Sequence, residues 1–324
     1  MVLVPLFFAC SKPPPTVPVP LDTDVPDTGP VDDTAVPVDT TPPLLTFDCG
    51  TVPAVPPPPV LLDAPRGSKD VAFDAEGWMI GSDGTNLVRA RSATRASLHT
   101  PNLGPLQKLA LLPDETLVAV GTGSVHRLWF LHPDGSRDEL PMPPMYGVEV
   151  GPDGKLYVTS DILAPFHVYR VDPDTLAVET LLELDVPPRD LAFTRDGRSL
   201  LVGTLSPGVY ALDFDEAGQP ADTLRLVATV PGTFHDVIEL DACGNLYIAA
   251  WDGTSMLRVA PDGTVQTLFE TTTVDYVHGL EWGRGAGPWS ELTAYLTTPN
   301  NGNRVLAWEL GVPSARWPGE LVGP

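Results

Sequence analysis

Polar residues suited to chemistry recur in this 324-residue sequence at the starts of short apolar runs. Those at the starts of the runs are Asp70, Lys108, Tyr146, Arg189, Asp190, His235, Asp236 and His278. Two glutamates lie one step further along their runs, Glu149 and Glu281. Polar loops after the next apolar run add Trp251, Asp252 and Asn300. Such residues could bind a ligand, hold a metal ion or transfer a proton if the fold gathers them.

Two chemistries compete for the histidines. His235 and His278 with Glu149 form a ligand set for Zn²⁺ or another transition metal, which makes one divalent metal a possible cofactor. Alternatively, either histidine could act as a general base without metal, oriented by Asp236 or by Glu281.

A third interpretation needs no chemistry at all, because buried charges often pair with one another. Arg189 could pair in this way with Asp190 or Asp236. A ligand-binding role is the remaining alternative, in which Tyr146 and Trp251 stack on a ligand. The polar residues that would complete such a binding site are Asp70, Glu149, Arg189, Asp190, Asp252 and Asn300.

The apolar runs belong to a sixfold repeat. Aligned repeats begin at Val71, Leu109, Val148, Leu191, Val237 and Leu280, at intervals of 38, 39, 43, 46 and 43 residues. A period near forty with about four strands per unit is typical of a β-propeller blade. The pattern predicts an all-β fold, a six-bladed β-propeller with four antiparallel strands in each blade.

The turns and the ends of the repeats refine this prediction. Segments such as Pro152–Gly154 and Pro261–Gly263 are expected to be hairpin turns rather than calcium loops, since they lack the regular series of acidic residues that calcium requires. The last repeat has only three good strands, so we expect residues 60–63 to supply its outer strand and close the ring. In a propeller, the starts of the first strands then meet around one mouth of the central channel.

At this point the sequence resembles a known family. The patterns HGLEW at 278–282 and PDGKLYV at 152–158 are similar to those of the gluconolactonase and senescence-marker-protein family, and also to NHL-repeat propellers. The resemblance covers about residues 71–310 and specifies the fold better than an activity.

The resemblance implies a lactonase-like activity and one divalent metal, often Ca²⁺, at the channel mouth. This chain departs from the family pattern at three positions. His278 stands at the position of an Asn in the family, His235 at that of an Asp, and Arg189 occupies a third such position. A cation beside a cation site is unfavourable, which disfavours ordinary calcium binding.

Composition excludes some partners. The chain has 42 acidic and 19 basic residues and a formal net charge of −23. Nucleic acids and anionic membrane surfaces are therefore not expected partners, because phosphate binding needs clustered Lys and Arg. We expect a monomer whose partner is a small molecule or an envelope protein.

The N-terminal region indicates export. Residues 1–10, MVLVPLFFAC, resemble a bacterial lipoprotein signal in which Cys10 is lipidated, and residues 11–47 form a linker rich in Pro, Thr and Asp that we expect to be disordered. The propeller would then span 48–324, with membrane contact only through the lipid. The alternative is that the first residues carry no targeting information.

Cysteine usage agrees with export. If Cys10 is lipidated, Cys49 and Cys243 remain, and an even remainder in an exported protein suggests a disulfide. The alternative is two unpaired thiols. The sequence thus favours an envelope-anchored module that binds a ligand or a protein through its channel mouth. The alternative is a lactonase-like hydrolase that works with or without a metal ion.

Overall fold

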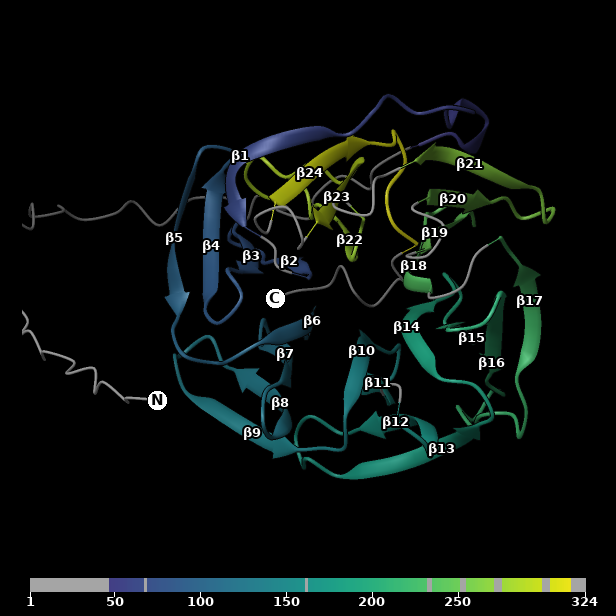
Figure 1. The fold of residues 1–324 in the computed structure, drawn as a ribbon, viewed down its shortest axis with the longest axis horizontal. Coiled ribbons are helices and arrows are strands. Elements are labelled where there is room, and N and C mark those ends of the chain that lie inside the picture. The colour runs from purple at the N-terminus through teal and green to yellow at the C-terminus, as the bar shows by residue number, and fades with distance from the viewer. Residues whose placement is uncertain are drawn as a thin grey trace, which may run out of the picture. The chain divides into compact units, whose positions relative to one another are not determined.

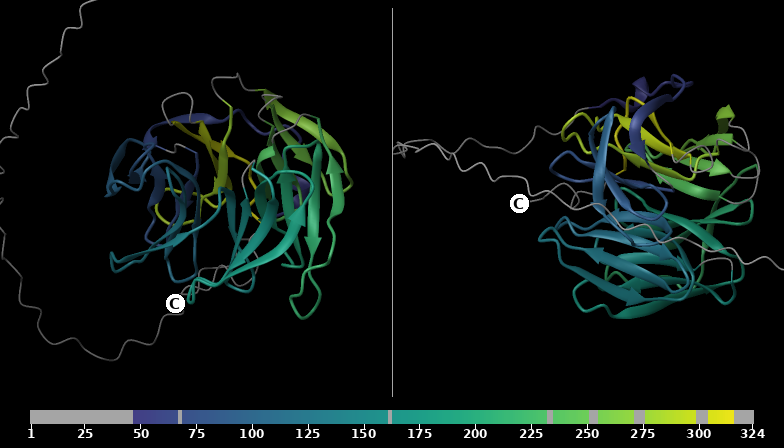
Figure 2. Two further views of the ribbon diagram at one scale, coloured as in Figure 1. Left: turned by 60° about the horizontal axis from the view of Figure 1, so that its bottom comes forward. Right: turned by 60° about the vertical axis from the view of Figure 1, so that its left-hand side comes forward.

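The computed structural model describes residues 47–66, 69–160, 163–231, 235–250, 255–270, 276–298 and 304–315. These residues form six four-stranded antiparallel sheets arranged in a closed ring (Figure 1), which two tilted views also show (Figure 2). The predicted six-bladed β-propeller is confirmed. The signal segment 1–10 and nearly all of the linker 11–47 lie outside the described residues. In the described part, no helix is long and apolar enough to cross a membrane.

The first three blades follow the chain, each from its innermost to its outermost strand. Blade 1 contains β2 (Val71–Phe73), β3 (Met79–Ser82), β4 (Leu87–Ser92) and β5 (Arg95–Thr100). Blade 2 contains β6 (Leu106–Leu111), β7 (Leu117–Thr122), β8 (His126–Leu131) and β9 (Arg137–Pro141). Blade 3 contains β10 (Met145–Val150), β11 (Leu156–Ser160), β12 (Phe166–Val171) and β13 (Val178–Leu184).

Blades 4 and 5 follow the chain in the same way, whereas blade 6 takes its outer strand from the segment before blade 1. Blade 4 contains β14 (Pro188–Phe193), β15 (Ser199–Thr204), β16 (Gly208–Asp213) and β17 (Arg225–Thr229). Blade 5 contains β18 (His235–Leu240), β19 (Leu246–Ala250), β20 (Ser255–Val259) and β21 (Val265–Glu270). Blade 6 contains β22 (Gly279–Trp282), β23 (Thr293–Thr298) and β24 (Arg304–Glu309), with β1 (Val60–Arg66) as its outer strand.

The hydrophobic core lies between the blades. Six clusters of buried apolar side chains occur, each shared by two neighbouring sheets. The second strand of a blade is therefore buried on both faces, as in β11 and β19, whose residues are all buried. This explains why these strands are continuous apolar runs in the sequence. The hairpin turns follow the predicted chemistry: Gly154 has φ of 73°, a conformation that favours glycine.

Ring closure uses the N-terminal segment, as predicted. Strand β1 pairs antiparallel with β24, with Val60 opposite Ala307 and Leu61 opposite Leu306. Before β1, the chain forms a short 3₁₀ helix, η1 (Cys49–Thr51), and Cys49 forms a disulfide with Cys243 of blade 5. This is the pair that the sequence predicts.

Hydrogen bonds fix the segment between the disulfide and β1. The Arg258 guanidinium donates to the carbonyl oxygens of Pro53 and Ala54, each at 2.8 Å. The indole of Trp308 donates to the carbonyl of Pro57 at 2.9 Å. The segment is thus held by blades 5 and 6 before it supplies the strand that completes the ring.

We predict that the disulfide stabilises ring closure. Replacing Cys49 and Cys243 together by Ser should lower the free energy of unfolding by roughly 2–5 kcal/mol, because the released segment gains conformational entropy in the unfolded state. Urea denaturation of both proteins measures this difference. A reductant should lower the stability of the wild type to that of the variant and leave the variant unchanged. Equal stabilities without reductant would contradict the prediction.

Candidate functional site at the channel mouth

The first strands of the six blades surround the central channel, and their starting residues meet at one mouth. Two glycines let neighbouring blades approach there. A Cβ on Gly147 would lie 2.5 Å from the carbonyl oxygen of Arg189, and one on Gly279 would lie 2.5 Å from that of Lys69. Only glycine therefore fits directly after Tyr146 and His278 without a shift of the backbone.

Two threonines hold the same carbonyl groups. Thr159 donates its hydroxyl to the Arg189 carbonyl at 2.5 Å, and Thr297 donates to the Lys69 carbonyl at 2.9 Å. Each threonine lies on the second strand of its blade and contacts the start of the next blade. The mouth is thus positioned by backbone contacts between adjacent blades.

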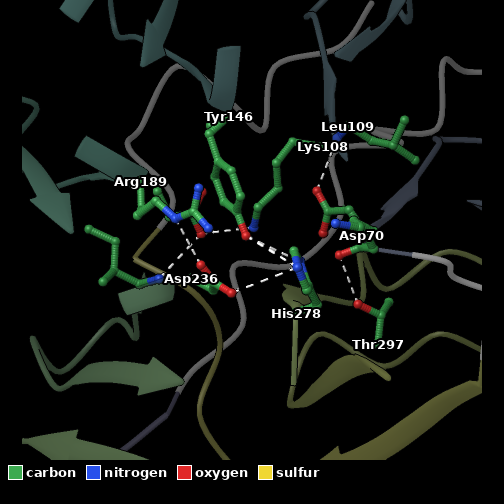
Figure 3. A network of polar contacts seen from close by, with 12 residues as sticks. Asp70, Lys108, Leu109, Tyr146, Arg189, Asp236, His278 and Thr297 are labelled. Atoms are coloured by element: carbon green, nitrogen blue, oxygen red, sulfur yellow. Dashed lines mark hydrogen bonds and ion pairs between the residues drawn. The ribbon is translucent and has the colours of Figure 1, made fainter. Parts of the chain in front are cut away.

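Tyr146, Arg189, Asp236 and His278 form one polar cluster at this mouth (Figure 3). The Tyr146 hydroxyl oxygen lies 3.3 Å from His278 Nδ1, and the two rings stack with centroids 5.9 Å apart. Arg189 Cζ lies 3.7 Å from the centre of the Tyr146 ring, a cation–π contact. Arg189 Nε donates to Asp236 Oδ1 at 2.9 Å, and Asp236 Oδ2 lies 3.7 Å from His278 Nε2.

A second ion pair lies beside this cluster. Lys108 Nζ donates to Asp190 Oδ2 at 2.8 Å, and both side chains are almost completely buried. Asp190 also accepts the backbone N–H of Ile238 at 3.2 Å, and Asp70 accepts that of Leu109 at 3.0 Å. Lys108 stands at a strand start in the sequence, aligned with Asp70 and Asp190 in the repeats. This alignment is the signal that places it in the channel.

Burial dominates the electrostatics of the cluster. It raises the pKa of Asp70 to about 6, against the opposing charge of Lys108. It also raises the pKa of Asp236, against the charge of Arg189 and a hydrogen bond from Tyr146. The pKa of His278 falls well below 6.5, because burial and the nearby cations Lys69, Lys108 and Arg189 disfavour the imidazolium form. His278 is therefore neutral at neutral pH.

Burial also raises the pKa of the Tyr146 phenol well above 10, so that Tyr146 stays protonated. Burial alone would lower the pKa of the Lys108 ammonium, but Asp190 and Asp70 raise it above its ordinary value. The mouth therefore holds the ion-paired cations Lys108 and Arg189 with Lys69 nearby, a neutral imidazole and a phenol that can donate a hydrogen bond.

The predicted site residues separate into two levels of the channel. Glu149 and Glu281 lie deeper, with Glu239, around a cavity of about 100 Å³ near the other ends of the first strands. The three glutamates occupy equivalent positions, each opposite a tyrosine of the next strand: Tyr157, Tyr247 and Tyr295. The other three blades have Ala72, Ala110 and Ala192 there. Burial and the charges of Glu281 and Glu149 raise the pKa of Glu239 well above 4.5.

The predicted metal ligand set is not assembled. The described residues contain no group of three or more His, Cys, Asp or Glu side chains that could hold a metal ion. His278 lies at the mouth, whereas Glu149 lines the deeper cavity. His235 is fully buried, with its Cβ packed towards Gly203 of blade 4. His235 is the first residue of β18 and pairs with Ala250, which is the position of the buried Met145 and Pro188 at the starts of β10 and β14, one residue before the mouth residues Asp236, Tyr146 and Arg189.

The remaining predicted positions have separate outcomes. Asp236 lies beside His278, as the acid–base interpretation requires. Glu281 Oε1 instead accepts the backbone N–H of Trp282 at 3.0 Å and lines the cavity with Glu149 and Glu239. Trp251, Asp252 and Asn300 lie outside the described residues.

The mouth also does not suit a divalent cation as the resemblance would imply. The carboxylates of Asp190 and Asp236 already accept hydrogen bonds from Lys108 and Arg189. A divalent ion at either carboxylate would be repelled by the neighbouring side-chain cation. The sequence prediction that Arg189 disfavours calcium agrees with this arrangement.

The comparisons with known proteins point to the same family as the sequence patterns. Residues 147–277 match a family model described as the SMP-30/gluconolactonase/LRE-like region. These residues include most of blade 3 and all described residues of blades 4 and 5. No curated protein matches the sequence significantly.

Solved structures share the fold. A gluconolactonase from Xanthomonas campestris is 18% identical, with a TM-score of 0.63, covering 84% of this chain and 99% of that chain. A luciferin-regenerating enzyme is 15% identical, with a TM-score of 0.62, covering 80% and 99%. The calcium-binding protein regucalcin from Agrobacterium tumefaciens is 17% identical, with a TM-score of 0.59, covering 80% and 95%. These structures confirm the fold, and the family model confirms the predicted resemblance over residues 147–277.

We predict that Asp70 makes stability depend on pH. A carboxyl whose pKa is raised from 3.8 to about 6 on folding binds its proton more tightly in the native state. It therefore stabilises the native state most below pH 4, and this contribution is lost as pH rises through 6. Asp70→Asn stays neutral at every pH. Its free energy of unfolding relative to that of the wild type should therefore rise by roughly 3 kcal/mol from pH 4 to pH 7.

Urea denaturation of both proteins across this pH range measures the difference. Asp213→Asn, at a partly exposed ion pair whose carboxyl pKa is lowered to about 2, is the matched control and should show no such rise in this range. A constant difference between Asp70→Asn and the wild type would contradict the prediction.

Proposed function

We propose that this protein is a hydrolase of small cyclic esters that acts at the channel mouth. The observation that carries the proposal is the contact of His278 with both Tyr146 and Asp236. The family match over 147–277, which contains Arg189 and Asp236, supports a lactonase-type activity. The gluconolactonase among the similar structures adds to this support.

The chemistry requires a base, a group that orients it and donors for a developing oxyanion. Neutral His278 takes a proton from water while the hydroxide adds to the lactone carbonyl carbon, and Asp236 stabilises the imidazolium that forms. Arg189 and the Tyr146 hydroxyl stabilise the negative oxygen. Collapse of the tetrahedral intermediate breaks the ring C–O bond, His278 returns the proton to the departing alkoxide, and the product is a hydroxy acid.

We predict that His278→Ala lowers kcat/KM for a hydrolysed lactone by roughly 10²–10⁴-fold, the usual contribution of a positioned general base. Tyr146→Phe keeps the ring under Arg189 but removes the donor and should cost on the order of 10²-fold. His99→Ala, at an exposed position of β5, is the matched control. The assay is a pH-indicator screen of aldonic and aliphatic lactones.

The pH profile gives an independent test of the base. Because the pKa of His278 is lowered well below 6.5, its base form persists on acidification. The kcat/KM should stay constant below pH 6.5 and fall only at the lowered pKa. No lactone hydrolysis by the wild type, or full activity in His278→Ala, would contradict the proposal.

A second candidate function is ligand binding without catalysis. It is favoured by the burial of the mouth side chains, since Tyr146, Asp236 and His278 are each no more than 3% exposed. Their charges are balanced by neighbours, as in a structural network. Under this alternative, Tyr146→Phe would change the affinity for a ligand while no substrate is turned over.

We propose further that the protein is exported and attached to the bacterial cell envelope through a lipid on Cys10. The Cys49–Cys243 disulfide supports this location, because disulfides persist in oxidising compartments. The predicted linker 11–47 would hold the propeller away from the membrane.

We predict that the full chain, expressed in a bacterial host, incorporates an alkyne-tagged fatty acid and fractionates with membranes. Cys10→Ala should lose both properties, whereas the matched variant Cys49→Ala should keep the label. An unlabelled wild type, or a labelled Cys10→Ala, would rule out this anchor.

A further inference from the structure

Three buried carboxylates meet at the channel mouth from three different blades. Asp70 belongs to blade 1, Asp190 to blade 4 and Asp236 to blade 5, and each is no more than 8% exposed. Carboxylates removed from water need compensating positive charge or they become protonated. What supplies that charge decides how the mouth is assembled.

Two side chains supply it by direct contact. Lys108 from blade 2 contacts Asp190 at 2.8 Å, and its charge also acts on Asp70. Arg189 from blade 4 contacts Asp236 at 2.9 Å. Lys108 therefore connects blade 2 to a carboxylate of blade 4, and Arg189 connects blade 4 to a carboxylate of blade 5. A shared metal ion would connect blades in the same way.

Side-chain charge does here what a bound metal ion would do. Lys108 and Arg189 contact two of the three carboxylates directly, and Lys69 adds a third positive charge near His278, which is itself neutral. A structural relative of this chain is a calcium-binding protein, so the same fold accommodates a divalent ion elsewhere.

We propose that Lys108 and Arg189 take the place of a divalent cation at this mouth, so that side-chain charge organises the site and no metal is required. The proposal does not depend on lactone hydrolysis. It concerns the charge that holds the carboxylates together, whether the mouth binds a ligand or turns over a substrate.

The first test is a titration of the full wild-type chain, purified in EDTA, with Ca²⁺ and with the luminescent ion Tb³⁺. We expect no stoichiometric binding and no change in Tm on adding millimolar Ca²⁺. One equivalent bound, with a rise in Tm, would overturn the proposal. The control is Arg225→Met, which removes the guanidinium of an exposed ion pair with Asp213. It reports how much Ca²⁺ or Tb³⁺ binds weakly to carboxylates of the acidic surface.

The second test removes the cations. Lys108→Met and Arg189→Met keep long unbranched side chains but leave Asp190 or Asp236 without its partner. We expect a large fall in Tm in EDTA and a partial recovery in millimolar Ca²⁺ or Mg²⁺, whereas Arg225→Met should change little and show no recovery. If the variants fold but neither Ca²⁺ nor Mg²⁺ raises their Tm, the proposal that Lys108 and Arg189 take the place of a divalent cation is overturned. If neither variant folds, the wild-type titration decides, and the presence or absence of lactonase activity affects neither test.

Discussion

Closure of the ring is the constraint on which the rest of the structure depends. A propeller buries its core between blades, so every interface needs a complete sheet on both sides, including the interface between the first and last repeats. Blade 6 is completed only by β1, which comes from the opposite end of the chain. The Cys49–Cys243 disulfide and the hydrogen bonds from Arg258 and Trp308 hold this strand in place. The channel mouth exists because this closure brings blade 1 beside blade 6.

The mouth shows how a propeller can bury charge in its channel. The ion pairs of Lys108 with Asp190 and of Arg189 with Asp236 each join two blades, and the glycine and threonine contacts beside them hold adjacent blades at a close distance. The cluster can therefore form only in the assembled ring. Its combination of a neutral histidine, a buried carboxylate and a guanidinium stacked on a phenol is suited to acid–base chemistry without a metal.

The similarity of this chain to known propellers is limited to part of the sequence and to the fold. The family match covers 147–277, and the similar structures share the fold at less than 25% identity. The polar residues at the mouth of this chain include Arg189 and His278, which are held by its own ion pairs and ring contacts. Because a fold does not determine an activity, the function proposed for this chain depends on its own residues.

The sequence by itself determined the architecture, because local patterns in each repeat specify its strands and turns. Apolar runs form the strands that are buried on both sides, and glycines occur where φ must be positive. It also predicted the closing strand, the disulfide pair and the polar ring at the mouth. Only the tertiary structure decided which of these residues meet. A shift of one residue along a strand reverses the direction of a side chain, so the register places Glu281 in the deeper cavity and buries His235 one residue before the mouth position that Asp236 occupies. The pairing of Lys108 with Asp190, 82 positions apart, likewise depends on blades that touch only in the closed ring.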